Sequence, residues 1–217
     1  MIVITGASDG LGKEVAKLYR EAGKTVVNIS RRESEYADIN ICLSLREGPE
    51  IKSAAKQVLA IDQPLETFIN CIGVFNGQEK FGEITEGEVK RLMSTNVNAP
   101  MLLTSLLIER IRKDETDILN VLSTAATKGN GRLPVYTASK WAERGYTKSL
   151  QDELKSTKCR VISFCPGGIN TQSAQKHSSP ERNVSTWMNP VAVAVLIKQL
   201  LDLPKSMEVS EIVINRN

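Results

Sequence analysis

The chain has 217 residues, which suits one domain at roughly 150 residues per domain, and 41% of them are hydrophobic, enough for one sizeable core. Its 28 Lys and Arg against 25 Asp and Glu leave a net charge of +3, which argues against nucleic acid as the main partner. The single histidine, His177, excludes a metal site built from two or three imidazoles and leaves only one base for a serine or cysteine nucleophile.

Strand and helix patterns alternate along the chain, starting with the buried apolar run 2–5. The first half predicts strands 2–5, 25–29, 39–45 and 67–70, with helices from Leu11 to the stop at Gly23 and from Pro49 to Ala60. The second half predicts helix 86–111 with a break near Pro100, strand 116–123, helix 134–155, strand 160–165, helix 190–203 and strand 211–215.

This alternation of buried strands and helices favours an α/β fold, a Rossmann-type doubly wound parallel sheet with helices on both faces. Neither an internal repeat nor a low-complexity linker divides the sequence, so we expect a single domain over 1–217. The longest apolar run, 191–197, is too short to span a bilayer, which needs about 20 residues, so we expect no membrane contact.

Cysteine usage and the first residues indicate the compartment. No pair among the four cysteines has C-x-x-C spacing, and each lies beside apolar residues, as buried reduced thiols do. Met1 leads directly into an apolar strand without a basic segment, so we expect no signal peptide. A cytoplasmic location is expected.

A glycine-rich loop, Thr5–Gly12, joins the first strand to the first helix. Gly6 permits a tight turn, Gly10 lets a phosphate approach the backbone, and Gly12 lets helix and strand pack closely. The free N–H groups of the helix start would then face a pyrophosphate. A plain structural turn is the alternative interpretation.

The same letters also fit the G-x-S-x-G nucleophile elbow of α/β hydrolases, with Ser8 as nucleophile and His177 as the only available base. The oxyanion loop of that fold comes from strands before the elbow, and only seven residues precede Ser8. The context therefore argues against a serine hydrolase.

Tyr136 and Lys140 lie four residues apart at the start of a predicted helix, on one face. A free phenol is a poor base at neutral pH, but a neighbouring ammonium favours the phenolate. Such a tyrosine can transfer a proton without histidine. Ser123 ends the fifth strand, where doubly wound sheets hold their active sites, and Asn96 lies within a helix, where an amide needs a partner.

These motifs and their order resemble the short-chain dehydrogenase/reductase family over nearly the whole length. The matching segments are T-G-x-x-x-G-x-G at Thr5–Gly12, a substituted N-N-A-G at Asn70–Gly73, the helix asparagine Asn96, N-x-S-S at Asn120–Ser123, Y-x-x-x-K at Tyr136–Lys140 and P-G-x-x-x-T at Pro166–Thr171.

The resemblance implies hydride transfer between a nicotinamide cofactor and a carbonyl or alcohol carbon, with a catalytic region over 96–140. It assigns proton transfer to Tyr136, binding of the substrate oxygen to Ser123, a ribose contact to Lys140 and a water relay to Asn96. The cofactor contacts it implies are Gly6, Ser8, Asp9, Gly10, Leu11, Gly12, Arg31, Arg32, Asn70, Cys71, Ile72, Gly73, Tyr136, Lys140, Pro166, Gly167, Ile169 and Thr171.

The end of the second strand favours NADP(H) over NAD(H). An NAD site usually has an acid at the Ser30 position, whereas here Arg31 and Arg32 follow and suit a 2′-phosphate. Asp9 lies where many NADP-using relatives carry a basic residue, so only this arginine pair supports the prediction. The adenine contact stays open between Ser44-Leu45 and Asp38.

The segment 172–188, which contains His177, is interpreted as a substrate lid. Its sequence specifies no substrate beyond a small carbonyl or alcohol compound. We expect a homodimer through helices 134–155 and 86–111, with Met101, Leu102 and Trp141 as candidate contacts; a homotetramer is the alternative. A dinucleotide-sensing regulator is the second hypothesis for function, although sensors tend to lose the Tyr/Lys pair.

Overall fold

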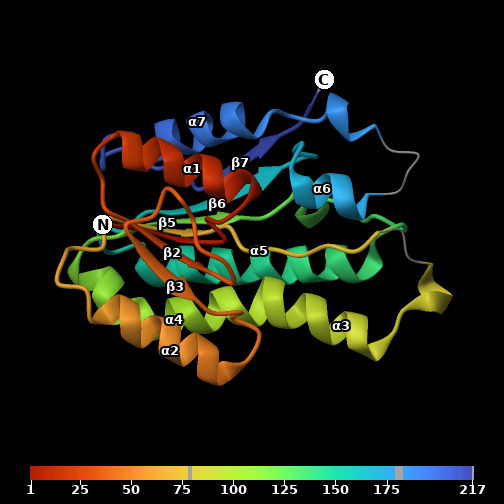
Figure 1. The fold of residues 1–217 in the computed structure, drawn as a ribbon, viewed down its shortest axis with the longest axis horizontal. Helices are drawn as coiled ribbons and strands as arrows, with labels where there is room; N and C mark the ends of the chain where they lie inside the picture. Colours follow the sequence, from red (N-terminus) through yellow and green to blue (C-terminus); the bar gives the residue numbers. More distant parts are fainter. Residues whose placement is uncertain (78–79, 179–182, 217) are drawn as a thin grey trace.

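A single parallel sheet organises the part of the chain that the computed structural model describes, residues 1–77, 80–178 and 183–216 (Figure 1). Within it the strand order is β3-β2-β1-β4-β5-β6-β7, and every neighbouring pair is parallel. The strands are β1 (Ile2–Thr5), β2 (Val26–Ser30), β3 (Ile39–Cys42), β4 (Thr67–Asn70), β5 (Asp117–Val121), β6 (Val161–Pro166) and β7 (Glu211–Ile214).

Helices cover both faces of the sheet, as Figure 1 shows. One face carries α1 (Gly10–Glu21) and α7 (Pro190–Leu201); the other carries α2 (Gly48–Leu59), α4 (Ala99–Lys113) and α5 (Pro134–Leu154). The remaining helices are α3 (Glu86–Met93), α6 (Gln172–His177) and the short turns η1 (Phe81–Glu83), η2 (Ser94–Asn98), η3 (Thr124–Ala126) and η4 (Val184–Thr186).

The sheet separates two apolar cores. Phe68 and Val27 pack with Leu103 of α4 on one face, while Ile4 and Phe164 pack against helices α1 and α7 on the other. Because both faces of the strands are covered, their sequences are continuous apolar runs, as expected for a parallel sheet. The predicted doubly wound α/β class is confirmed.

The long helix predicted over 86–111 is three segments. It runs as α3, then the π-helical turn η2, then α4, which ends at Lys113. Pro100 lies in the first turn of α4, where a missing backbone N–H is tolerated, so the predicted break is real and falls just before the proline.

Two further segments differ from the sequence expectation. Strand β3 ends at Cys42 rather than at residue 45, because the chain turns away and Leu45 adopts a positive φ of 55°. The stretch 167–188, which carries no visible periodicity, contains α6, whose six residues are too few to display one. None of the described helices is both long and apolar enough to cross a membrane.

The order of the strands creates a crevice next to β1. The chain runs outward from β1 to β3 on one side and from β4 to β7 on the other, so the loops after β1 and β4 diverge at their carboxyl ends. Thr5 holds the two loops in register, since its hydroxyl accepts hydrogen bonds from the backbone N–H groups of Cys71 and Ile72, both at 3.1 Å.

Candidate active site

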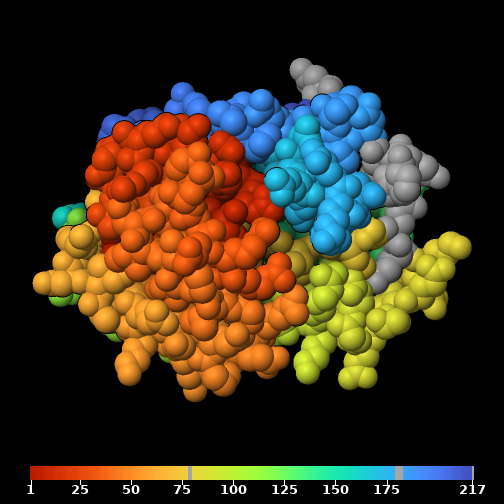
Figure 2. Space-filling view, in the orientation of Figure 1, coloured from red at the N-terminus to blue at the C-terminus, as the bar shows by residue number. Residues whose placement is uncertain are grey.

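An open cleft of about 1490 Å³ lies along the carboxyl ends of the strands. It runs from the end of β2 past the glycine loop, which follows β1, to Tyr136 and α6. In Figure 2 the surface is hollowed where the N-terminal third of the chain meets α6. This is the place where doubly wound sheets bind ligands.

Each of the three loop glycines is required by a different feature of the loop geometry. Gly6 and Gly10 have φ values of 79° and 55°, which L-residues with a side chain rarely adopt. A Cβ on Gly12 would lie 2.3 Å from the Gly6 carbonyl oxygen, so α1 packs directly on the turn. A Cβ on Gly10 would lie 3.2 Å from the Thr171 side chain, so the two predicted cofactor loops meet.

Asp9 occupies the start of α1. Its carboxylate accepts a 2.7 Å hydrogen bond from the Gly10 N–H and forms a 3.1 Å ion pair with Arg32. Arg31 is exposed on the wall of the cleft. Both arginines line the cleft, but Arg32 already has a carboxylate partner, whereas no ion pair of Arg31 is found among the described residues.

The structure separates the two adenine alternatives. Ser44 lines the cleft and donates a hydrogen bond to Glu50, and Arg46, which the sequence analysis missed, lines it beside Ser44. Asp38 lies elsewhere: its carboxylate accepts hydrogen bonds from the Val26 N–H and from Arg20. Leu45 is fully buried. Of Ser44, Leu45 and Asp38, the candidates for the adenine contact, Ser44 is therefore the one that lines the cleft.

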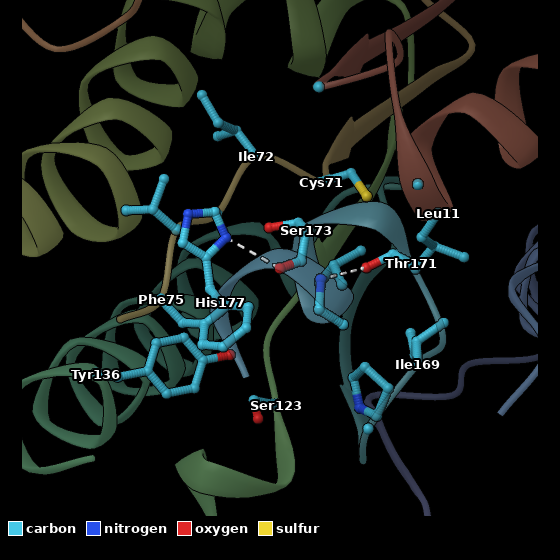
Figure 3. Close-up of a pocket in the computed structure, with 18 of the residues that line it drawn as sticks. Leu11, Cys71, Ile72, Phe75, Ser123, Tyr136, Ile169, Thr171, Ser173 and His177 are labelled. Atoms are coloured by element: carbon cyan, nitrogen blue, oxygen red, sulfur yellow. Dashed lines mark hydrogen bonds between the residues drawn. The ribbon is translucent and has the colours of Figure 1, made fainter. Parts of the chain in front are cut away.

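The opposite end of the cleft gathers the motif residues of the second half (Figure 3). Ser123 follows β5 and caps η3, accepting a 3.1 Å hydrogen bond from the Ala125 N–H. Tyr136 projects from the first turn of α5 on the same side, its ring edge-on to Phe75 at 6.1 Å. Tyr136 is half-buried, and both side chains reach the cleft.

Lys140 is a buried residue at the same end of the cleft as Tyr136 and Ser123. Its side chain is 3% exposed, and its ammonium donates hydrogen bonds to the Val121 carbonyl at 3.1 Å and to the Glu143 carboxylate at 2.7 Å. Burial alone would lower the pKa of Lys140, but Glu143 and Tyr136 outweigh it, so this pKa lies above its usual value. The lysine is therefore a cation beside Tyr136.

Asn96 lies behind the cleft wall in the π-turn η2. Its amide exchanges two hydrogen bonds with the Val74 backbone, at 2.8 and 2.9 Å, and donates a third to Ser139 at 3.0 Å. A Cβ on Gly73 would lie 3.6 Å from the Lys140 ammonium nitrogen and 3.8 Å from the Asn96 side-chain oxygen. Asn96 thus fixes the segment that passes over Lys140.

Asn70 does not line the cleft in the described part of the chain. Its side chain is buried at the end of β4 and donates a 2.8 Å hydrogen bond to Asn120, whose own amide reaches Thr147. Its side chain therefore joins β4 to β5 and α5. The other cofactor residues expected from the sequence do line the cleft, from Gly6 to Thr171.

The predicted lid supplies two aromatic walls. His177 ends α6, and its Nδ1–H donates a 3.0 Å hydrogen bond to the Ser173 carbonyl. Its ring stands edge-on to Phe75 at 5.7 Å. Trp187 packs on Gly168 so closely that a Cβ there would lie 2.6 Å from the ring. Residues 179–182 of the predicted lid fall outside the described residues.

Sequence reasoning missed Phe75 and Glu143, and it placed Trp187 in the lid without giving it a role. The signal for Glu143 was present: positions 136, 140 and 143 share one helix face. Ser8 lines the cleft in the glycine turn, and no contact found among the described residues joins it to His177, so the hydrolase interpretation gains no support.

The site fits a dinucleotide. The turn of the glycine loop, whose backbone angles favour glycine, meets the start of α1. Arginines mark one end of the long cleft, and the Tyr136, Ser123 and Lys140 cluster marks the other.

Comparison with known proteins agrees with this geometry. The family model described as short chain dehydrogenase matches residues 1–182. Ketoacyl reductase HetN of Nostoc sp. is 30% identical over 78% of this chain, and the match spans only 63% of that protein.

Solved structures share the fold. A 3-ketoacyl-(acyl-carrier-protein) reductase of Brucella melitensis complexed with NADH has a TM-score of 0.88 at 24% identity, covering 99% of this chain and 96% of its own. A serine dehydrogenase complexed with NADP+ has a TM-score of 0.85 at 19% identity, covering 99% and 94%.

Proposed function

The chain belongs to the short-chain dehydrogenase family of oxidoreductases, and on that premise we propose that it interconverts a carbonyl compound and an alcohol with NADP(H). The observation that carries the proposal is the meeting of Tyr136, Ser123 and the buried Lys140 at one end of a cleft that the glycine turn also lines.

Each residue has a proposed role that follows from its position. Tyr136 exchanges the proton with the substrate oxygen, and Ser123 donates a hydrogen bond to that oxygen as charge develops on it. The Lys140 ammonium, held beside Tyr136, favours the phenolate and binds the ribose of the cofactor. Asn96 keeps the segment above Lys140 in place. The bound nicotinamide supplies or accepts the hydride.

The cofactor preference rests on Arg31. Its guanidinium faces the cleft just past β2, where the ribose 2′-phosphate of NADP would lie, whereas Arg32 is engaged by Asp9. Arg46 adds a further positive charge to the same end of the cleft. We propose NADP(H) for this reason, with Arg31 as the main contact of the phosphate.

The substrate is proposed to enter beside α6 and contact Phe75, Trp187 and His177 before reaching Tyr136. We retain segment 172–188 as the proposed lid and 1–217 as one functional domain. A homodimer through α4 and α5 completes the proposal, because Met101, Leu102 and Trp141 are exposed apolar side chains on these helices.

The proposal is tested with a panel of ketones, aldehydes and quinones, assayed for NADPH oxidation. We expect turnover of at least one class and its loss, by about a hundredfold or more, in Tyr136→Phe, since general acid catalysis contributes roughly 10²–10⁴-fold. Tight NADPH binding without turnover on any carbonyl would instead favour a dinucleotide sensor.

A further inference from the structure

A second ionisable side chain is buried against the lysine of the site. The Glu143 carboxylate lies 2.7 Å from the Lys140 ammonium, and the two side chains are 1% and 3% exposed. One carboxylate oxygen, Oε2, takes the hydrogen bond; the other, Oε1, is buried without a hydrogen-bond partner among the described residues. A carboxylate in the core is costly and calls for a reason.

Stability of the fold does not supply that reason. Removing two charges from water costs several kcal/mol per ion, and well-packed apolar residues often replace such pairs without loss. Proton relay to solvent does not supply it either, because Glu143 is sealed inside the molecule. What distinguishes the pair is its location, with Lys140 one helical turn and Glu143 two turns after Tyr136.

We propose that Glu143 is a positioning residue that holds the Lys140 ammonium against the Val121 carbonyl and balances its charge, so that the ammonium draws the Tyr136 proton less strongly. This inference rests on the proposed function. It adds a residue to the machinery of the site.

The charges around the pair give this effect its sign. An unbalanced ammonium favours the Tyr136 phenolate, and a carboxylate next to the ammonium opposes it. The other titratable groups facing the pair are the thiols of Cys71, after β4, and Cys165, on β6. Burial raises the pKa of these thiols to about 12 and about 11, so both stay neutral.

The effect belongs to neutral and alkaline pH. Burial raises the pKa of Glu143 to about 7 against the opposing influence of Lys140, so the carboxylate is charged above that pH and neutral below it. A neutral replacement therefore matches the native protein in acid and departs from it in base.

The test compares Glu143→Gln, which keeps shape and hydrogen-bond acceptor but removes the charge, with Glu153→Gln, a matched change on the exposed side of α5. The first readout is tyrosinate absorbance of the full-length chain without cofactor, with the signal of Tyr136 isolated by subtracting the Tyr136→Phe background. The second readout is the pH profile of NADPH-dependent carbonyl reduction.

We expect Glu143→Gln to move both the Tyr136 ionisation midpoint and the fall of reductase activity about one pH unit lower, the size of a charge removed across several ångströms of protein. Glu153→Gln leaves both unchanged. Glu143→Asp, with its carboxylate drawn back by one methylene, gives a smaller shift of the same sign and carries the test if Glu143→Gln does not fold.

Superimposable titrations of the native protein and Glu143→Gln would overturn the inference. Failure of the proposed function looks different: the absorbance midpoint moves in Glu143→Gln, but no carbonyl is reduced by the native protein.

Discussion

At the scale of single residues, the two arginines after β2 illustrate what a sequence leaves undecided. The sequence singles out Arg31, directly after the Ser30 position, for the phosphate contact and predicts Arg32 as a further cofactor residue. In the structure Asp9 pairs with Arg32 at 3.1 Å, while Arg31 faces the cleft. The difference arises from the turn of the glycine loop, which carries Asp9 toward the end of β2, and this contact is invisible in the sequence.

Arg31→Ala is therefore expected to weaken NADPH binding by roughly 10–100-fold, the value of one or two charge-assisted hydrogen bonds, and to leave NADH binding nearly unchanged. Titration with each reduced cofactor, followed by its nicotinamide fluorescence, measures the affinities for NADPH and NADH. Arg32→Ala is the matched control and should cost several-fold less, because its guanidinium is held by Asp9. Equal losses in the two variants, or none in Arg31→Ala, would refute the assignment.

Some residues of the candidate site could be predicted from the sequence, and others could not. Tyr136, Lys140 and Ser123 follow from motif spacing and from the rule that active sites form at the carboxyl ends of parallel strands. The structure brings them to one cleft, and their catalytic roles stay predictions. For Glu143 the spacing shows the shared helix face but not the burial, because a Lys and a Glu three apart on a helix usually form a solvated pair, and only packing decides that this one is buried.

At the scale of elements, the π-turn η2 explains why Asn96 is tolerated inside a helix. The wider turn places its amide against the loop after β4, where it satisfies both polar groups of Val74. The sequence predicts that Asn96 needs a partner, but the partner lies 22 residues away in the chain and depends on the tertiary fold. The strand and helix order could be predicted; the π-turn and the short helix α6 could not.

Asn96→Ala should lower the free energy of unfolding by about 2–4 kcal/mol, because it leaves the buried Val74 N–H and C=O unpaired. Chemical denaturation measures this. The control is Asn98→Ala in the same π-turn, where the side chain is exposed and a change within about 0.5 kcal/mol is expected. Equal stability of the two variants would mean that the Asn96 bonds contribute nothing net.

At the scale of the whole molecule, the outer surface of α4 is the feature that a monomer leaves unexplained. Met101, Leu102 and Leu106 are 38–47% exposed on this helix, and Trp141 on α5 is 46% exposed. Apolar side chains gathered on neighbouring helices are typical of protein interfaces. The sequence points to Met101, Leu102 and Trp141, but exposure separates them from core residues such as Leu103 only in the folded structure.

Leu102→Asp is expected to convert the proposed dimer to a monomer at micromolar concentration, because it places a charge in an apolar contact. Light scattering coupled to size-exclusion chromatography gives the mass directly. Val195→Asp provides the control on α7, at the opposite face of the sheet, where Val195 is 39% exposed. Dissociation by Val195→Asp alone would move the interface to the other face.

Because Trp187 packs on Gly168 in the cleft, ligand binding there can be followed by tryptophan fluorescence. Of the two tryptophans in the chain, Trp187 lines the cleft and Trp141 lies on the exposed side of α5. Reduced nicotinamide absorbs in the range where indole emits, so a bound dinucleotide quenches Trp187 by energy transfer and reports through its own emission. With Trp141→Phe as the background, the protein carries a single built-in optical sensor for occupancy of its own site.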